Sequence, residues 1–274
     1  MVALVRLALG VGGGLALALA YPPYGQPWVA PLAVAVFLVA VAGARTRPAL
    51  VVGLLFGLAF VGLHAEWMRQ VSDGAWIGLT VALALFYALI GLVASWLWRL
   101  PVAPFWIACA WTAIEGLRST WPFGGMPWGQ LAFAVVDTPL MHSLPYVGTT
   151  GVTFALAFVG ALLARLVVGP HRLRAVEWLV VVAVLAAIPV VRPWHIPSVN
   201  GVSGVIRPDG SIQAQETGSR ARGLEEEVPL VSGRTPADLA GSWPWRGTIL
   251  ITVGGVLVMS LSSLRRRRRR TVEE

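Results

Sequence analysis

Residues 108–154 read ACAWTAIEGLRSTWPFGGMPWGQLAFAVVDTPLMHSLPYVGTTGVTF. An apolar helix ends with Glu115 and Arg118, a loop rich in Trp, Gly and Pro follows, and a second apolar helix begins near Pro145. Ionisable residues at the end of a membrane helix mark a functional site by default, because they are costly there unless paired or facing water. Their spacing of three residues places both charges on one helix face, where they can neutralise each other. The alternative interpretation is a salt bridge that only anchors the helix end.

The composition places the chain among membrane proteins. It has 274 residues, a mean hydropathy of +0.73 and only 12% charged residues. Its apolar runs are too long and too many for the core of a water-soluble protein. We therefore predict an all-α polytopic membrane bundle.

The apolar runs predict about eight transmembrane helices, because one span needs about 20 mostly apolar residues. In the third span, Gly53 and Gly57 have the small-xxx-small spacing that lets two helix backbones approach closely. The predicted helices cover residues 2–20, 28–42, 48–67, 75–97, 103–117, 146–168, 175–191 and 247–264. The predicted domains are a seven-helix bundle (1–191), an extracytoplasmic segment (192–246), the eighth helix (247–264) and a basic cytoplasmic tail (265–274).

The arginines orient these spans. All the basic residues are Arg, and an unbroken run of them begins at Arg265 and ends at Arg270, directly after the last apolar span. Cytoplasmic loops carry an excess of basic residues, so we place both termini in the cytoplasm. We expect the run to contact anionic lipids of the inner leaflet. This interpretation accounts for the net charge of +8 without a nucleic-acid partner.

The segment 192–246 is the one part of the chain with soluble character. The alternating residues 201–207, the turn Pro208-Asp209-Gly210 and residues 211–214 predict a β-hairpin, and residues 227–231 predict a third short strand. Three short strands bury little surface on their own, so we expect them to lean on the membrane bundle.

Several motifs, taken in order, resemble one bacterial family. They are YPPYG at 21–25, IEGLR at 114–118, FGGMPWGQLA at 123–132, GTTGVTF at 148–154, NGVSGVIRPDG at 200–210 and GRTP at 233–236. These motifs resemble the apolipoprotein N-acyltransferases, and the resemblance covers nearly the whole chain. It implies a multi-pass protein of the bacterial cytoplasmic membrane, whose partners are phospholipid and the lipidated N-terminus of a lipoprotein. The segment 192–246 resembles the closing strands of the family's nitrilase-like domain.

The resemblance also implies catalytic residues that this chain lacks. In the family, a Glu base, a Lys that stabilises the oxyanion and a Cys that carries the acyl group as a thioester lie in the nitrilase-like domain. This chain has no Lys, and its one Cys, Cys109, falls inside an apolar helix. We therefore predict no catalytic residues here and no N-acylation by the thioester route.

Four residues are the predicted remains of a substrate surface at the outer membrane boundary: Trp128, Pro127, Glu115 and Arg118. The alternative for Trp128 is an aromatic anchor at that boundary. We predict no cofactor and no metal site, since His64 and Glu66 alone are too few ligands.

Two further hypotheses stay open at this point. In the first, the bundle is a non-catalytic scaffold that binds lipid or lipoprotein, or that anchors another membrane enzyme. The resemblance suggests a polyprenol-phosphate-mannose synthase as that enzyme, because this family's membrane part is associated with one in some bacteria. In the second, the chain is a nonfunctional product of an internal deletion, joined at residues 195–199.

Overall fold

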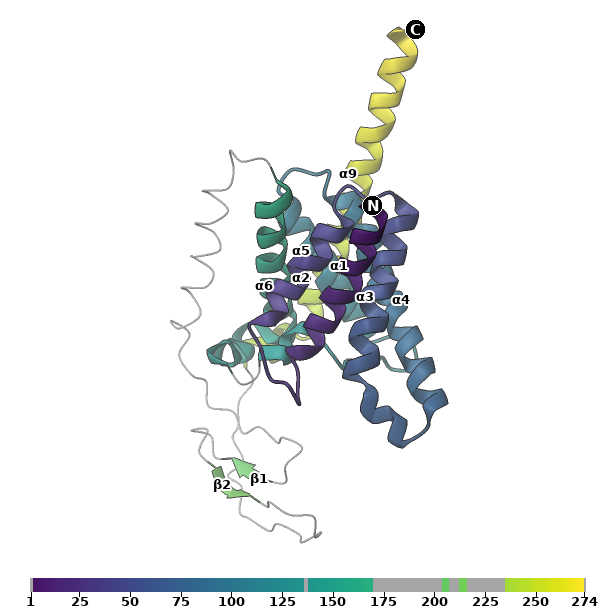
Figure 1. Cartoon of the computed structure of the whole chain (residues 1–274). Helices are drawn as coiled ribbons and strands as arrows, with labels where there is room; N and C mark the ends of the chain where they lie inside the picture. Colours follow the sequence, from purple (N-terminus) through teal and green to yellow (C-terminus); the bar gives the residue numbers. More distant parts are fainter. Residues whose placement is uncertain (1, 136–137, 170–203, 207–211, 216–234, 274) are drawn as a thin grey trace.

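The structure is a computed structural model that describes residues 2–135, 138–169, 204–206, 212–215 and 235–273. Within these residues the chain forms a bundle of α-helices and one strand pair (Figure 1). The α-helices are α1 (Val2–Leu19), α2 (Val29–Val41), α3 (Thr46–His64), α4 (Asp73–Leu97), α5 (Ala103–Arg118), α6 (Leu144–Val168), α8 (Pro236–Ala240) and α9 (Trp243–Glu273). The 3-10 helices are η1 (Glu66–Gln70), η2 (Leu131–Val135) and η3 (Pro139–Ser143), and the strands are β1 (Gly204–Ile206) and β2 (Ile212–Gln215).

The first six helices begin and end within three residues of their predicted bounds. The largest difference is at the end of the third, which was predicted to reach Trp67, whereas α3 ends at His64 and η1 follows. The predicted seventh helix, 175–191, lies outside the described residues. The arrangement of eight spans therefore stays a prediction.

Five stretches of the described chain are long and apolar enough to cross a membrane. They are α1, α3, α4, the first 19 residues of α9, and Pro139–Val168, which joins η3 to α6. Helix α2 is apolar but has only 13 residues, a length of about 20 Å against a hydrocarbon core of about 30 Å.

Helices α3 and α4 pack with their backbones in close contact. A Cβ on Gly57 would lie 2.6 Å from the Cα of Ala84, and a Cβ on Gly53 would overlap the carbonyl of Tyr87. Only glycine permits this approach. The small-xxx-small prediction for this helix is confirmed.

Aromatic rings fill the centre of the bundle. Trp111 of α5 is fully buried, and its ring packs edge-on against Phe37 of α2, with the centroids 5.8 Å apart. The ring of Phe56 on α3 packs tilted against Phe37, with the centroids 4.4 Å apart, and the centroids of Tyr87 on α4 and Trp111 are 6.1 Å apart. Four helices thus share one aromatic core, which fixes α5 against its neighbours.

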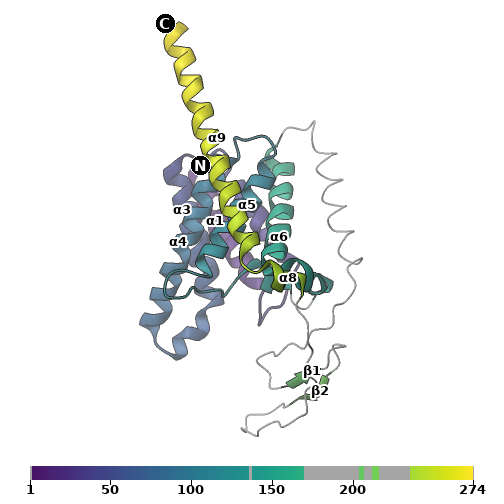
Figure 2. The ribbon, with the colours of Figure 1, turned by 180° about the vertical axis from the view of Figure 1, so that it is seen from behind.

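The two ends of the chain lie at the same end of the bundle in both views (Figures 1 and 2). Helix α9 begins at Trp243, with Pro244 in its first turn, and continues to Glu273. The helix therefore extends beyond the predicted bounds of 247–264 at both ends, and the arginines at 265–270 continue it. The reason is that proline suits a first turn and arginine has high helix propensity. The candidate membrane span of α9 is Trp243–Leu261, so the basic cytoplasmic tail stays a prediction.

The strands β1 and β2 pair antiparallel, with Gly204 opposite Gln215 and an irregularity between Val205 and Ile206. They lie where the first two strands were predicted. The predicted third strand, 227–231, falls outside the described residues, so a larger β unit stays a prediction.

Candidate functional site

A buried carboxylate holds the end of α5. Glu115 is 3% exposed, and its Oε1 accepts hydrogen bonds from the indole Nε1 of Trp111 at 3.1 Å and from the backbone N–H of Leu131 at 3.2 Å. The Oγ1 of Thr153 donates to its Oε2 at 3.0 Å. One side chain thereby joins α5, α6 and the start of η2.

Arg118 stands apart from this network. Its side chain is 1% exposed, and none of its three guanidinium nitrogens has a hydrogen-bond partner in the described part of the chain. The guanidinium carbon lies 5.7 Å from the ring centre of Tyr87 on α4, within the range of a cation–π contact.

The alternative of a salt bridge between Glu115 and Arg118 is wrong, although their opposite charges still attract each other at longer range. The neutralisation of Glu115 by Arg118 stays a prediction. No ion pair within 4.0 Å joins the two side chains, the described ion pairs being those of Arg69. The physical reason is that three donors already occupy the Glu115 oxygens, while Arg118 turns toward α4.

The loop after α5 folds back onto the helix end. The backbone N–H of Met126 donates to the carbonyl of Arg118 at 2.8 Å, and the Nε2 of Gln130 donates to the Oγ of Ser119 at 2.6 Å. Gly125 has a φ of +89°, and a Cβ there would overlap the Ser119 backbone. Glycine is required at this position, because other residues would be strained and would clash.

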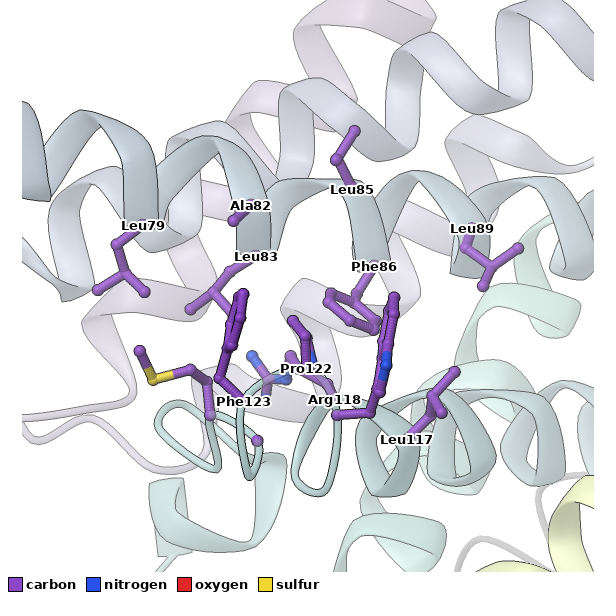
Figure 3. Close-up of a pocket in the computed structure, with 13 residues that line it drawn as sticks. Leu79, Ala82, Leu83, Leu85, Phe86, Leu89, Leu117, Arg118, Pro122 and Phe123 are labelled. Carbon is purple, nitrogen blue, oxygen red and sulfur yellow. The ribbon is translucent and has the colours of Figure 1, made fainter.

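An apolar cavity of about 470 Å³, the α4 groove, lies between α4 and this loop (Figure 3). Six residues of α4 between Leu79 and Leu89 line it, together with Leu117, Arg118 and the loop between Trp121 and Met126. Arg118 is the one charged residue of this lining. Figure 3 shows its guanidinium between the side chains of Phe123 and Pro122.

A second cavity, of about 440 Å³, contains Trp128, and we call it the Trp128 cavity. Trp128 is 42% exposed and packs edge-on against Trp67, with ring centroids 5.1 Å apart. Tyr21 and His64 line the same cavity, with their ring centroids 4.6 Å apart. Pro127 is exposed and lines neither cavity.

The structure therefore separates the four predicted site residues. Glu115 lies in the core, Arg118 in the α4 groove, Trp128 in the Trp128 cavity, and Pro127 on the surface.

Sequence reasoning gave no role to Tyr87 or to the hydroxyl of Tyr21. The Tyr21 hydroxyl donates to the backbone carbonyl of Gln130 at 2.8 Å, across 109 residues of sequence. Burial raises the pKa of this hydroxyl well above its usual value. No local pattern could have indicated a partner so distant; the one available signal was the YPPYG turn itself.

The site offers binding surfaces and lacks an accessible thiol. Cys109 is 1% exposed within α5 and lines neither of the two cavities, whereas a nucleophilic thiol must be accessible and have a base in reach. In the described residues, no group of three or more His, Cys, Asp or Glu side chains could hold a metal ion.

Comparison with known proteins gives a consistent match. A family model described as the apolipoprotein N-acyltransferase N-terminal domain matches residues 13–162. The apolipoprotein N-acyltransferase of Methylococcus capsulatus is 32% identical over 177 residues, which are 57% of this chain and 34% of that protein. The enzymes of that name from Pasteurella multocida and Pseudomonas syringae pv. tomato are 30% and 31% identical over 67% and 69% of this chain. The matched part is 34–38% of the length of these relatives.

Proposed function

The chain belongs to the apolipoprotein N-acyltransferase family, and we propose that it binds lipidated lipoprotein N-termini and phospholipid without transferring an acyl chain by the thioester route. It acts in the bacterial cytoplasmic membrane, with both termini in the cytoplasm. Five apolar helices of membrane-spanning length support the location.

One observation carries the proposal that no thioester forms. The 274 residues contain no lysine, and their single cysteine, Cys109, is buried in α5. Without an accessible thiol there is no atom to hold the acyl group, and without a lysine the usual donor to the tetrahedral oxyanion is missing. The strands β1 and β2 belong, in this proposal, to the end of a nitrilase-like domain whose catalytic part is absent from the chain.

The bundle keeps the surfaces that a lipid or lipopeptide needs. The Trp128 cavity presents two half-exposed indoles, Trp67 and Trp128, beside the buried hydroxyl of Tyr21. Aromatic rings of this kind bury large apolar areas at little entropic cost and anchor ligands at membrane boundaries. Glu115 serves as a positioning residue, because it ties the base of the loop to α5 and α6.

The arginine run supports the proposed orientation. The run continues α9 beyond its last apolar residues. The C-terminus of α9 and the N-terminus of α1 lie at the same end of the bundle (Figures 1 and 2). Basic residues next to a membrane span bind anionic lipids of the cytoplasmic leaflet. We propose that contact for the arginines at 265–270.

Binding of a diacylated lipopeptide to the purified full chain in detergent tests the proposal. We expect saturable binding that weakens at least tenfold in Trp128→Ala, because truncating an aromatic anchor that the bound ligand covers costs about 2 kcal/mol or more. The matched control is Trp243→Ala, since Trp243 is also an exposed indole, 74% accessible, but lines neither cavity. Equal affinity of the Trp128→Ala chain and wild type would remove Trp128 from the binding surface.

A further inference from the structure

Arg118 is a buried cation that has neither a hydrogen-bond partner nor an ion pair within 4.0 Å in the described part of the chain. All three guanidinium nitrogens are enclosed and unpartnered, and the lining of the α4 groove contains no acidic residue. Its guanidinium carbon lies 5.7 Å from the centre of the Tyr87 ring, and the charge of Glu115 acts on it from beyond ion-pair distance. A buried charge is costly unless it is paired and hydrogen-bonded, above all within a membrane. The three unpartnered donors of this guanidinium, in the lining of a cavity, therefore point to an anionic ligand that accepts hydrogen bonds.

The α4 groove around Arg118 suits an alkyl chain. Its α4 residues extend from Leu79 to Leu89, which is about 15 Å along the helix. Leu85 and Leu89 are 58% and 37% exposed on the outer side of α4, where lipid would surround the bundle. A cavity of about 470 Å³ falls within the size range of small-ligand sites, which is about 300–1,000 Å³.

We propose that the α4 groove binds a long-chain fatty acid, with the carboxylate on the guanidinium of Arg118 and the alkyl chain along α4. This inference rests on the proposed function, because it names one lipid that the bundle binds. A carboxylate matches the planar fork of a guanidinium and needs few donors. A phospholipid head group would bring both phosphate and ester oxygens into the groove. Arg118 is the one charged donor of the lining, so some of these oxygens would be left without a hydrogen bond.

Access to the guanidinium requires the loop between Trp121 and Met126 to shift, because the Arg118 nitrogens are covered in the unliganded chain. The shift would break the hydrogen bond from the Met126 N–H to the Arg118 carbonyl. It would lose little burial at the centre of the loop, because Phe123 is fully exposed.

Scintillation proximity binding of tritiated palmitate to the full chain in dodecyl maltoside, at pH 8 so that the carboxylate is ionised, tests the inference. We expect saturable binding, competition by unlabelled palmitate, and no competition by methyl palmitate, which has the chain without the charge. Arg118→Met should weaken binding at least tenfold. The control Arg69→Met removes an exposed arginine that is paired with Glu66 and Asp73, and it should bind as wild type does.

Two further variants keep the test independent of the folding of Arg118→Met. Ala82→Phe adds a ring to the α4 groove while Arg118 itself is unchanged, and it should also weaken palmitate binding at least tenfold. Val81→Phe, at an exposed neighbour that does not line the α4 groove, should not. In the absence of ligand, Arg118→Met should raise the melting temperature, because it removes a buried guanidinium whose donors have no hydrogen-bond partner. An arginine with a purely structural role would lower it.

Three results would overturn the inference: unchanged palmitate binding in both Arg118→Met and Ala82→Phe, equal competition by methyl palmitate, or binding of phosphatidylglycerol in place of palmitate. The lipopeptide assay on the same preparations separates this inference from the proposed function. A chain that binds lipopeptide but not palmitate contradicts the fatty-acid site alone. A chain that binds palmitate but not lipopeptide supports the site and contradicts the proposed lipoprotein binding.

Discussion

The carboxylate of Glu115 provides the sharpest test of how the site is held together. Replacing it by alanine removes the acceptor of three hydrogen bonds, from Trp111, Leu131 and Thr153, at a position that is 3% exposed. Each buried donor left unpaired costs about 1–3 kcal/mol. The measured contribution of a hydrogen bond between membrane helices to stability lies at or below about 1 kcal/mol, the low end of that range. We therefore expect Glu115→Ala to lose about 3 kcal/mol of stability.

Glu115→Gln separates hydrogen bonding from charge. The glutamine oxygen can accept from Trp111 and Leu131 where Oε1 does now, and its amide can donate to the hydroxyl of Thr153, which is both donor and acceptor. Three hydrogen bonds are then kept without the negative charge. Because Arg118 forms no ion pair with this carboxylate, we expect Glu115→Gln to retain most of the stability that Glu115→Ala loses.

Unfolding of the purified full chain in mixed micelles, followed by circular dichroism, measures both variants against wild type. Glu66→Ala is the control, because Glu66 is an exposed carboxylate that forms only a surface ion pair, and such pairs contribute little. A Glu115→Gln chain as unstable as Glu115→Ala would mean that the charge matters, and would refute the separation of Glu115 from Arg118.

Further predictions concern packing and pH. Gly57→Ala should lower the free energy of unfolding by about 1–3 kcal/mol, since its Cβ would lie 2.6 Å from the Cα of Ala84. Gly12→Ala, whose Cβ would have no atom within 4 Å, should raise it slightly through helix propensity. Melting temperatures of the two variants that move in the same direction would contradict this. Tyr21→Phe should cost about 1 kcal/mol by removing the donor to Gln130. Because burial raises the pKa of folded Tyr21, the unfolded chain loses this proton first, so wild-type stability should fall above about pH 10. Tyr21→Phe should show a smaller fall, and identical pH profiles would exclude the contribution.

Local sequence patterns predicted the helices well because each is a long apolar run bounded by polar or proline residues. Gly53 and Gly57 could be assigned to a close helix contact from their spacing alone, and the structure supplies α4 as the partner. The helical extension of α9 through the arginines was not predicted, because the run was interpreted by its charge alone, although arginine favours helix.

The candidate site could be predicted as a region but not as a geometry. The positions of Glu115 and Arg118 indicated the right helix end, but their spacing suggested a pair that tertiary contacts prevent. Thr153 lies 38 residues beyond Glu115 in the sequence, so its hydrogen bond to the carboxylate could not be predicted from a local pattern. Tyr87 on α4, which faces Arg118, is also far from it in the sequence and belongs to no motif.

The most direct test of the proposed function is mass spectrometry of a diacylated lipopeptide incubated with phospholipid and the purified full chain. A complete apolipoprotein N-acyltransferase, such as that of Methylococcus capsulatus, serves as the positive control. We predict that the lipopeptide binds and that its mass stays unchanged, while the control adds one acyl chain. A gain of one acyl chain with this chain alone, retained in Cys109→Ala, would contradict the proposal and would require a nucleophile other than the single thiol.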